Sequence, residues 1–159
     1  NSERAELAYD RMKGYTHQAA KLQSIFTGEQ LDCIAGIETG RTWDPNTVSK
    51  YGRVGLFQFD KNNWEETGTS IDWANGEAAK DPAVAVVVTL SFLYRKLGYS
   101  GVESPTEEAI TRAIDNFGEG DGRYGQAVMD CARQLEAGDF QGAFGTLANY
   151  ATWVARGRP

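Results

Sequence analysis

The amino-acid sequence predicts a mostly helical domain of the α+β class, with a small β-hairpin or sheet early in the chain. Several segments carry apolar residues at helical spacing between capping residues. One turn-rich stretch, residues 43–60, holds the strand-like run Val-Gly-Leu-Phe-Gln-Phe at positions 54–59. Because 159 residues suffice for one sizeable core, we expect a single domain over residues 1–159.

The first helical patterns lie before this stretch. Residues 2–25 are predicted to form one or two helices, with Gly14 as a break between them in the second case. The next helix begins with a capping box, in which the Thr27 side chain caps the backbone and Gln30 returns the hydrogen bond.

Glu38 continues the apolar stripe of this second helix. Leu31, Ile34 and Glu38 recur at i, i+3 and i+7, and Gly40 is typical of a helix end. A glutamate in a last helical turn is ordinarily exposed. A place on the apolar face, directly before a turn-rich loop, instead favours a partly buried carboxyl with a raised pKa. Such a group can donate a proton near neutral pH.

The rest of the chain is predicted to be helical. Residues 81–98 are predicted to form a helix that is apolar nearly all round, with Asp81 as N-cap, Pro82 in the first position and Gly98 past the end. Ser104 is expected to cap the helix that follows it. Two further amphipathic helices come next, and the last is capped by Asp139.

Charge and hydropathy argue against nucleic acid as a partner and against a membrane span. The net charge is −6 and the isoelectric point about 4.8, without a cluster of Lys and Arg in the sequence. This balance argues against nucleic acid as a partner. The longest apolar run, residues 83–94, is too short to cross a bilayer, so we expect no membrane span.

The sequence indicates neither a metal site nor a cofactor. His17 is the single histidine, and the two cysteines, Cys33 and Cys131, belong to no CxxC motif. Zinc binding and a His-dependent nucleophile are therefore not expected. The cysteines either form a disulfide in an oxidising compartment or remain buried thiols.

Residues 33–59 resemble the signature of the lysozyme-like superfamily, in its bacterial lytic transglycosylase branch. The family pattern is a helix ending in Glu-Ser-Gly, a loop with Asn-Pro, then Ser, Gly and Gly-Leu-Met-Gln. The matching residues are Glu38-Thr39-Gly40, Asp44-Pro45, Ser49, Gly52 and Gly55-Leu56-Phe57-Gln58. A later block is similar to the family's Ala-Tyr-Asn-x-Gly-x-Gly, through Asn116, Gly118 and Gly120. The resemblance covers about residues 30–130.

The chain departs from the family pattern at a few positions. Thr39 stands for Ser and keeps a hydroxyl, and Phe57 stands for Met and keeps apolar bulk. Asp44 replaces Asn before the proline, and Asp115 occupies the place of a family Tyr that contacts substrate.

The resemblance implies a muramidase, which cleaves the β-1,4 bond between N-acetylmuramic acid and N-acetylglucosamine in peptidoglycan. Glu38 matches the family's catalytic acid, and the small β region would form one wall of the cleft. Enzymes of this superfamily also serve as secreted antibacterial effectors that act in a bacterial periplasm. The implied partners are a peptidoglycan glycan strand and, for an effector, the producer's periplasmic inhibitor (immunity) protein.

A second acid is a separate question, since glycoside hydrolysis ordinarily uses two carboxylates. If Gln58 faces the cleft from a strand, Asp60 faces it too and would assist Glu38. Asp60 is equally suited to cap the helix that follows it.

Four residues are candidates for binding sugar, and each has a structural alternative. Phe59 and Tyr124 lie in apolar patterns that are typical of a core, and Asn116 lies where a helix end could need a cap. The candidates are Gln58, Phe59, Asn116 and Tyr124.

Three alternative functions stay open. A lytic transglycosylase needs Glu38 alone, because the sugar's own hydroxyl attacks and a 1,6-anhydro product forms. A chitinase or chitosanase is the second alternative, since folds related to the superfamily also cut those polymers. A non-catalytic glycan-binding module on a degraded enzyme fold is the third. The presence of both Glu38 and the 55–58 block argues against it.

Overall fold

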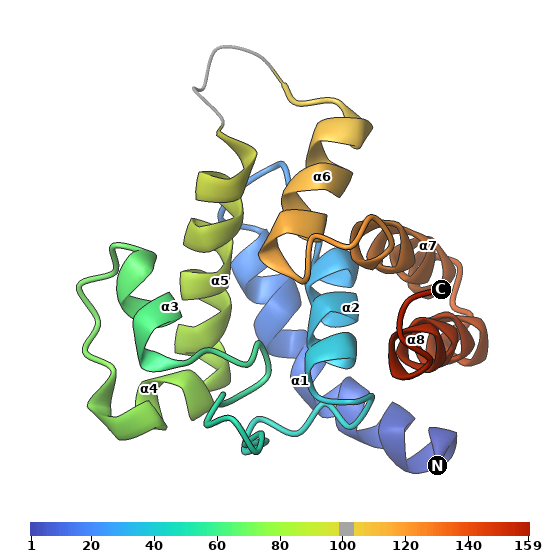
Figure 1. Cartoon of the computed structure of the whole chain (residues 1–159), viewed down its shortest axis with the longest axis horizontal. Helices are drawn as coiled ribbons and strands as arrows, with labels where there is room; N and C mark the ends of the chain where they lie inside the picture. Colours follow the sequence, from blue (N-terminus) through green and yellow to red (C-terminus); the bar gives the residue numbers. More distant parts are fainter. Residues whose placement is uncertain (99–103) are drawn as a thin grey trace.

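The computed structural model describes residues 1–98 and 104–159, and its regular structure is helical (Figure 1). The elements are α1 (Ser2–Ala20), α2 (Gly28–Glu38), α3 (Lys61–Glu66), the short 3-10 helix η1 (Ala74–Gly76), α4 (Glu77–Lys80), α5 (Pro82–Leu97), α6 (Glu107–Phe117), α7 (Tyr124–Glu136) and α8 (Phe140–Ala155).

The predicted β-hairpin or sheet is wrong: no β-strand forms within residues 1–98 and 104–159, and the fold class is all-α. Residues 43–60, which were predicted to contain the β region, form an irregular loop with two isolated β-bridges, one between Val54 and Val48 and one between Val54 and Phe59. Positive φ angles at Gly52, Gly55 and Gln58, of 79°, 89° and 54°, turn the chain too often for a ladder to extend.

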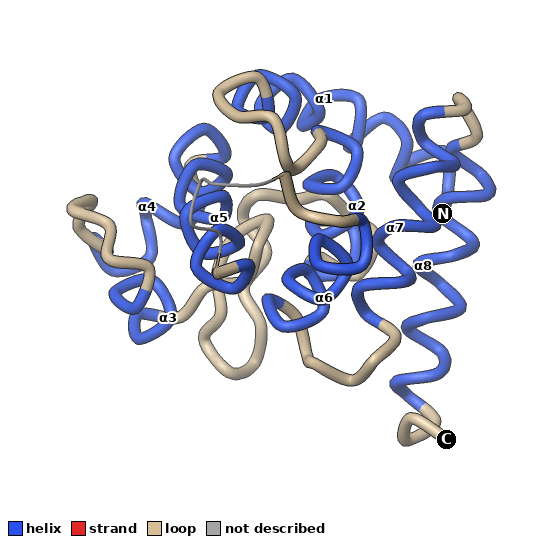
Figure 2. The backbone as a smooth tube through the Cα atoms, turned by 90° about the horizontal axis from the view of Figure 1, so that it is seen from above, coloured by secondary structure: helices blue, strands red, loops and turns tan. Residues whose placement is uncertain are grey.

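Helix α2 lies at the centre of the molecule. It packs against α1, α7 and α8, and eight of its eleven residues are buried. Figures 1 and 2 show α3, α4 and α5 on one side of it and α7 and α8 on the other. The predicted capping box of Thr27 and Gln30 is confirmed. The helix ends at Glu38, and Gly40 follows with a φ of 64°.

The other helix signals are mostly confirmed. Helix α1 runs through Gly14 without a break, because a single glycine weakens a helix by only about 1 kcal/mol relative to alanine and keeps its backbone hydrogen bonds. Asp81 caps α5 and Gly98 ends it, as predicted. The cap of α6 is Thr106 rather than Ser104, since the Thr106 hydroxyl accepts from the third backbone N–H of the helix. None of the described helices is long and apolar enough to cross a membrane.

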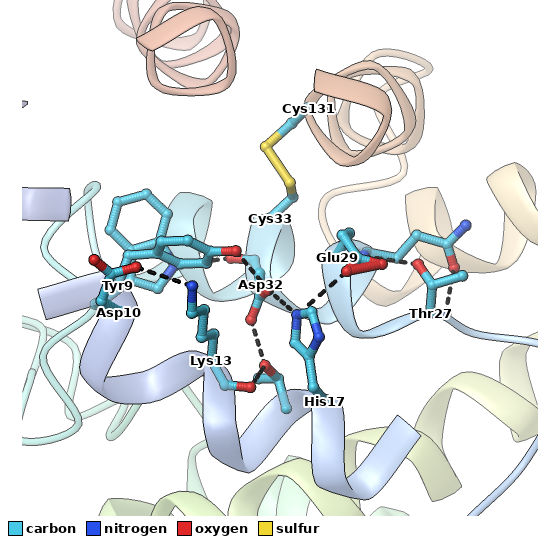
Figure 3. Close-up of polar contacts among 12 residues, drawn as sticks. Tyr9, Asp10, Lys13, His17, Thr27, Glu29, Asp32, Cys33 and Cys131 are labelled. Carbon is cyan, nitrogen blue, oxygen red and sulfur yellow. Dashed lines mark hydrogen bonds and ion pairs between the residues drawn. A yellow bond between two sulfur atoms is a disulfide. The ribbon is translucent and has the colours of Figure 1, made fainter. Parts of the chain in front are cut away.

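Covalent and polar contacts fasten α2 to its neighbours (Figure 3). A disulfide joins Cys33 on α2 to Cys131 on α7, with the two Cα atoms 6.1 Å apart, which decides between the two alternatives for the cysteines. On the α1 side, the buried carboxylate of Asp32 accepts hydrogen bonds from Tyr9 and Thr16 and contacts His17 Nε2 at 2.7 Å. Helix α2 is therefore held from both sides.

Candidate functional site

Glu38 is the last residue of α2, and its carboxyl is only partly exposed. Its Oε2 accepts a hydrogen bond of 2.7 Å from the hydroxyl of Tyr124, the first residue of α7. Tyr124 is completely buried. Because the disulfide also joins α2 to α7, the carboxyl and its donor sit on two helices that are covalently tied.

The environment of Glu38 raises its pKa from about 4.5 to about 7. Burial is the main cause, because a low-dielectric surrounding disfavours the charged carboxylate. The hydrogen bond from Tyr124 lowers the pKa, the negative charge of Glu119 raises it, and the positive charge of Arg53 lowers it again. A substantial fraction of Glu38 is therefore protonated near neutral pH, as its place on the apolar stripe of the helix predicts.

Two cavities meet at Glu38. One measures about 320 Å³ and has a largely apolar wall from α8, and the other measures about 200 Å³ and lies towards α5 and α6. The residues common to both linings are Glu38, Arg53, Gln58 and Glu119. The carboxyl thus stands between two binding spaces, an arrangement that can hold a chain molecule on both sides of a bond.

The loop that bears Gln58 is held by its own hydrogen bonds. The Gln58 side-chain amide donates to the backbone oxygens of Thr47 at 3.1 Å and Gly55 at 2.9 Å. At Gly55 a Cβ atom would lie 2.0 Å from the backbone oxygen of Ala79, so this close packing requires glycine. Gln58 is 9 % exposed, lines both cavities and shapes the loop from within.

The block around residue 118 positions Tyr124. A Cβ atom on Gly118 would lie 2.5 Å from the Tyr124 ring, so glycine is needed for the ring to reach Glu38. Asn116 is exposed and lines the smaller cavity, where a bound sugar could meet it. Tyr124 itself is core, and its contribution to the site is the hydroxyl on Glu38.

Asp60 and Phe59 have structural roles. Asp60 caps α3, with its Oδ1 accepting the backbone N–H of Asn63 at 2.8 Å, and it lines neither cavity beside Glu38. Its other oxygen lies 4.0 Å from the Nε of Arg53. Phe59 lines the smaller cavity but is 2 % exposed and packs edge-on against Trp64.

Sequence reasoning missed several residues that line the site. Arg53 and Glu119 stand beside Glu38, and Arg158 reaches the larger cavity from the C-terminal segment. Asp121 holds that segment by accepting hydrogen bonds from Arg158 at 3.1 Å and from the Tyr150 hydroxyl at 2.6 Å. These contacts join residues 29 and 37 positions apart, and no local sequence pattern indicates them.

In the part of the chain that the structure describes, no group of three or more His, Cys, Asp or Glu side chains is placed to hold a metal ion. No family model, no curated protein and no solved structure matches the chain. An assignment of function therefore depends on the sequence blocks between residues 30 and 130 and on the chemistry around Glu38.

Proposed function

We propose that the chain is a peptidoglycan-degrading muramidase that cleaves the β-1,4 bond between N-acetylmuramic acid and N-acetylglucosamine, with Glu38 as general acid. The observation that carries the proposal is a carboxyl with a pKa of about 7 at the junction of two cavities. A glycosidic oxygen is a poor leaving group, and a positioned proton donor makes its departure possible.

The proton transfer follows from the contacts of Glu38. A glycan strand lying across both cavities places its scissile oxygen over the carboxyl. Protonated Glu38 gives its proton to that oxygen as the bond to the anomeric carbon breaks. The Tyr124 hydroxyl then donates to the carboxylate that is left, which stabilises the new charge in a poorly solvated place.

The position of Asp60 favours a second candidate, the lytic transglycosylase. Asp60 caps α3, which is one of the two alternatives for this residue, and it lines neither cavity, so no contact supports it as a second carboxylate beside Glu38. In a transglycosylase the substrate's own hydroxyl closes the ring, and Glu38 suffices. In a hydrolase, water attacks the anomeric carbon and a second carboxylate assists it. Glu119 is the other carboxylate that lines both cavities with Glu38.

Mass spectrometry of the soluble products from purified peptidoglycan tests both candidates. We expect muropeptides from the wild type and from the exposed-surface control Glu136→Gln, and none from Glu38→Gln. Products with reducing ends indicate a hydrolase, and 1,6-anhydro products indicate a transglycosylase. Equal cleavage by Glu38→Gln, or binding of peptidoglycan without cleavage by the wild type, would refute the proposal.

The proposed place of action is a bacterial periplasm or cell wall, reached by secretion as an antibacterial effector. The disulfide between Cys33 and Cys131 supports this, because such bonds persist in oxidising compartments. An inhibitor (immunity) protein of the producing cell is the proposed protein partner. Co-purification from the producer's periplasm on immobilised wild-type protein tests that partner.

A further inference from the structure

Three arginines gather around a third cavity, which we call the arginine cavity. It measures about 420 Å³ and lies between the N-terminal half of α1 and the loop after α2. Arg4 and Arg11 border it from α1, and Arg41 borders it from the loop. Its less polar lining comes from Ala5, Ala8, Met12, Trp43 and Pro45.

The guanidinium groups of these arginines have no acidic partner. Within residues 1–98 and 104–159, no carboxylate lies within 4.0 Å of Arg4, Arg11 or Arg41. Elsewhere in the described chain, Arg133 and Arg158 do form ion pairs. Three unpaired guanidiniums on one cavity of a chain with net charge −6 mark a place that attracts anions.

Arg41 is held in a manner that keeps its charge available. Its Nε is buried and has no hydrogen-bond partner, and its guanidinium lies over the Phe144 ring, 5.5 Å from the centroid. The one acid in the lining, Asp44, uses its Oδ1 to accept the backbone N–H of Asn46 at 2.9 Å. A buried donor without a partner costs stability, and an anionic ligand would satisfy it.

Arg41 also connects the arginine cavity to the site of Glu38. It lines both the arginine cavity and the cavity of about 320 Å³ beside Glu38. Its backbone has a φ of 67°, and its N–H donates to the oxygen of Gly36 at 2.7 Å, which sets the loop against the end of α2. Arg41 is therefore the residue along which an acidic branch of a ligand seated at Glu38 would reach the arginine cavity.

We propose that the arginine cavity binds the carboxylates of the peptide that is attached to the sugar held beside Glu38. This inference rests on the proposed function, because only a peptidoglycan strand would present such a branch there. The peptide stem carries several free carboxylates, and guanidinium groups recognise carboxylates through paired N–H donors. Arg4 and Arg11 would act as binding residues and would leave the chemistry at Glu38 unchanged.

A pair of substrates tests the inference. The double variant Arg4→Gln/Arg11→Gln is compared with Arg112→Gln/Arg156→Gln, which has the same net charge and changes two exposed arginines outside the arginine cavity. On peptide-bearing glycan strands, we expect the first variant to raise KM about threefold to tenfold. On strands stripped of peptide by an amidase, both variants should match the wild type. An equal change on both substrates, or none, would overturn the inference.

A binding measurement separates this inference from the proposed function. The tripeptide L-Ala-γ-D-Glu-L-Lys and its fully amidated form are titrated into the ¹⁵N-labelled Glu38→Gln protein. We expect the acidic peptide alone to shift the amide signals of Arg41, Thr42 and Trp43, and Arg4→Gln/Arg11→Gln to abolish the shifts. Equal shifts with the amidated peptide, or no shifts with either peptide, contradict the proposal that the arginine cavity binds carboxylates. A lack of glycan cleavage with these shifts intact contradicts the proposed function alone.

Discussion

The pair formed by Glu38 and Tyr124 shows how one hydroxyl sets the chemistry of a carboxyl. Burial raises the pKa of the Tyr124 hydroxyl well above its ordinary value, and the charge of Glu38 raises it further. The tyrosine is therefore a neutral donor at every pH at which Glu38 titrates. The carboxyl alone changes charge near neutral pH, and its ionised form always has a donor at 2.7 Å.

Replacing Tyr124 by Phe should change the pH dependence of cleavage. In the wild type the acid is protonated below its pKa of about 7, so activity should fall as the pH rises through 7. The Tyr124 hydrogen bond lowers that pKa, so its loss should move the fall to higher pH. The maximal rate should drop roughly threefold to tenfold, because one hydrogen bond to the developing carboxylate is lost.

The measurement is the rate of peptidoglycan cleavage against pH for the wild type and Tyr124→Phe. Tyr15→Phe serves as the control, because Tyr15 is exposed on α1. A fall in activity at the same pH in the wild type and Tyr124→Phe, or at a lower pH in the variant, would show that the hydroxyl does not act on Glu38.

Among the elements, the contact between α1 and α2 depends on one buried carboxylate. Asp32 is 1 % exposed, and its charge is held by donors that come from α1 (Figure 3). Its backbone oxygen accepts the indole N–H of Trp43 at 2.9 Å, so the same residue also fixes the loop after α2. Burial raises the pKa of Asp32, and the contact with His17 opposes that rise. The packing of α1 therefore depends on the protonation of His17.

The contact between His17 and Asp32 predicts that the fold becomes less stable as the pH rises. The hydrogen bond to Asp32 raises the pKa of His17 above 6.5, although burial opposes it, and Glu29 adds to the rise. A raised histidine pKa stabilises the fold fully below about pH 6.5, and the stabilisation is lost as the pH rises through the folded-state value. Urea unfolding should therefore show a larger loss for His17→Gln at about pH 6 than at about pH 9.

The control for this comparison is Gln18→Ala, which changes the exposed neighbour of His17 on α1. Its effect on the free energy of unfolding should be the same at both pH values. If the loss in His17→Gln were larger at the higher pH, the ion pair with Asp32 could not be the stabilising contact.

On the scale of the whole molecule, local signals in the sequence predicted the helices, and non-local contacts decided the rest. The caps Thr27 and Asp81 were recognisable because they bond within three residues of themselves. Glu38 was recognisable from its place on an apolar stripe. The prediction of a sheet was wrong because a short apolar run also suits a loop packed on the core, where residues 54–59 are all buried, and the positive φ of Gln58 has no sequence signal. Arg158 reaches the site only through long-range packing.

The disulfide gives the last prediction, since it joins residues 98 positions apart. Closing so long a loop removes much of the conformational freedom of the unfolded chain. In the chain-entropy model this raises the free energy of unfolding by about 4–5 kcal/mol. In urea unfolding, the double variant Cys33→Ala/Cys131→Ala should therefore have a free energy of unfolding several kcal/mol lower than that of the wild type. Wild type treated with a thiol reductant should behave in the same way, and the reductant should leave the double variant unchanged. If the oxidised and the reduced wild type unfold at the same urea concentration, the disulfide between α2 and α7 does not stabilise the fold.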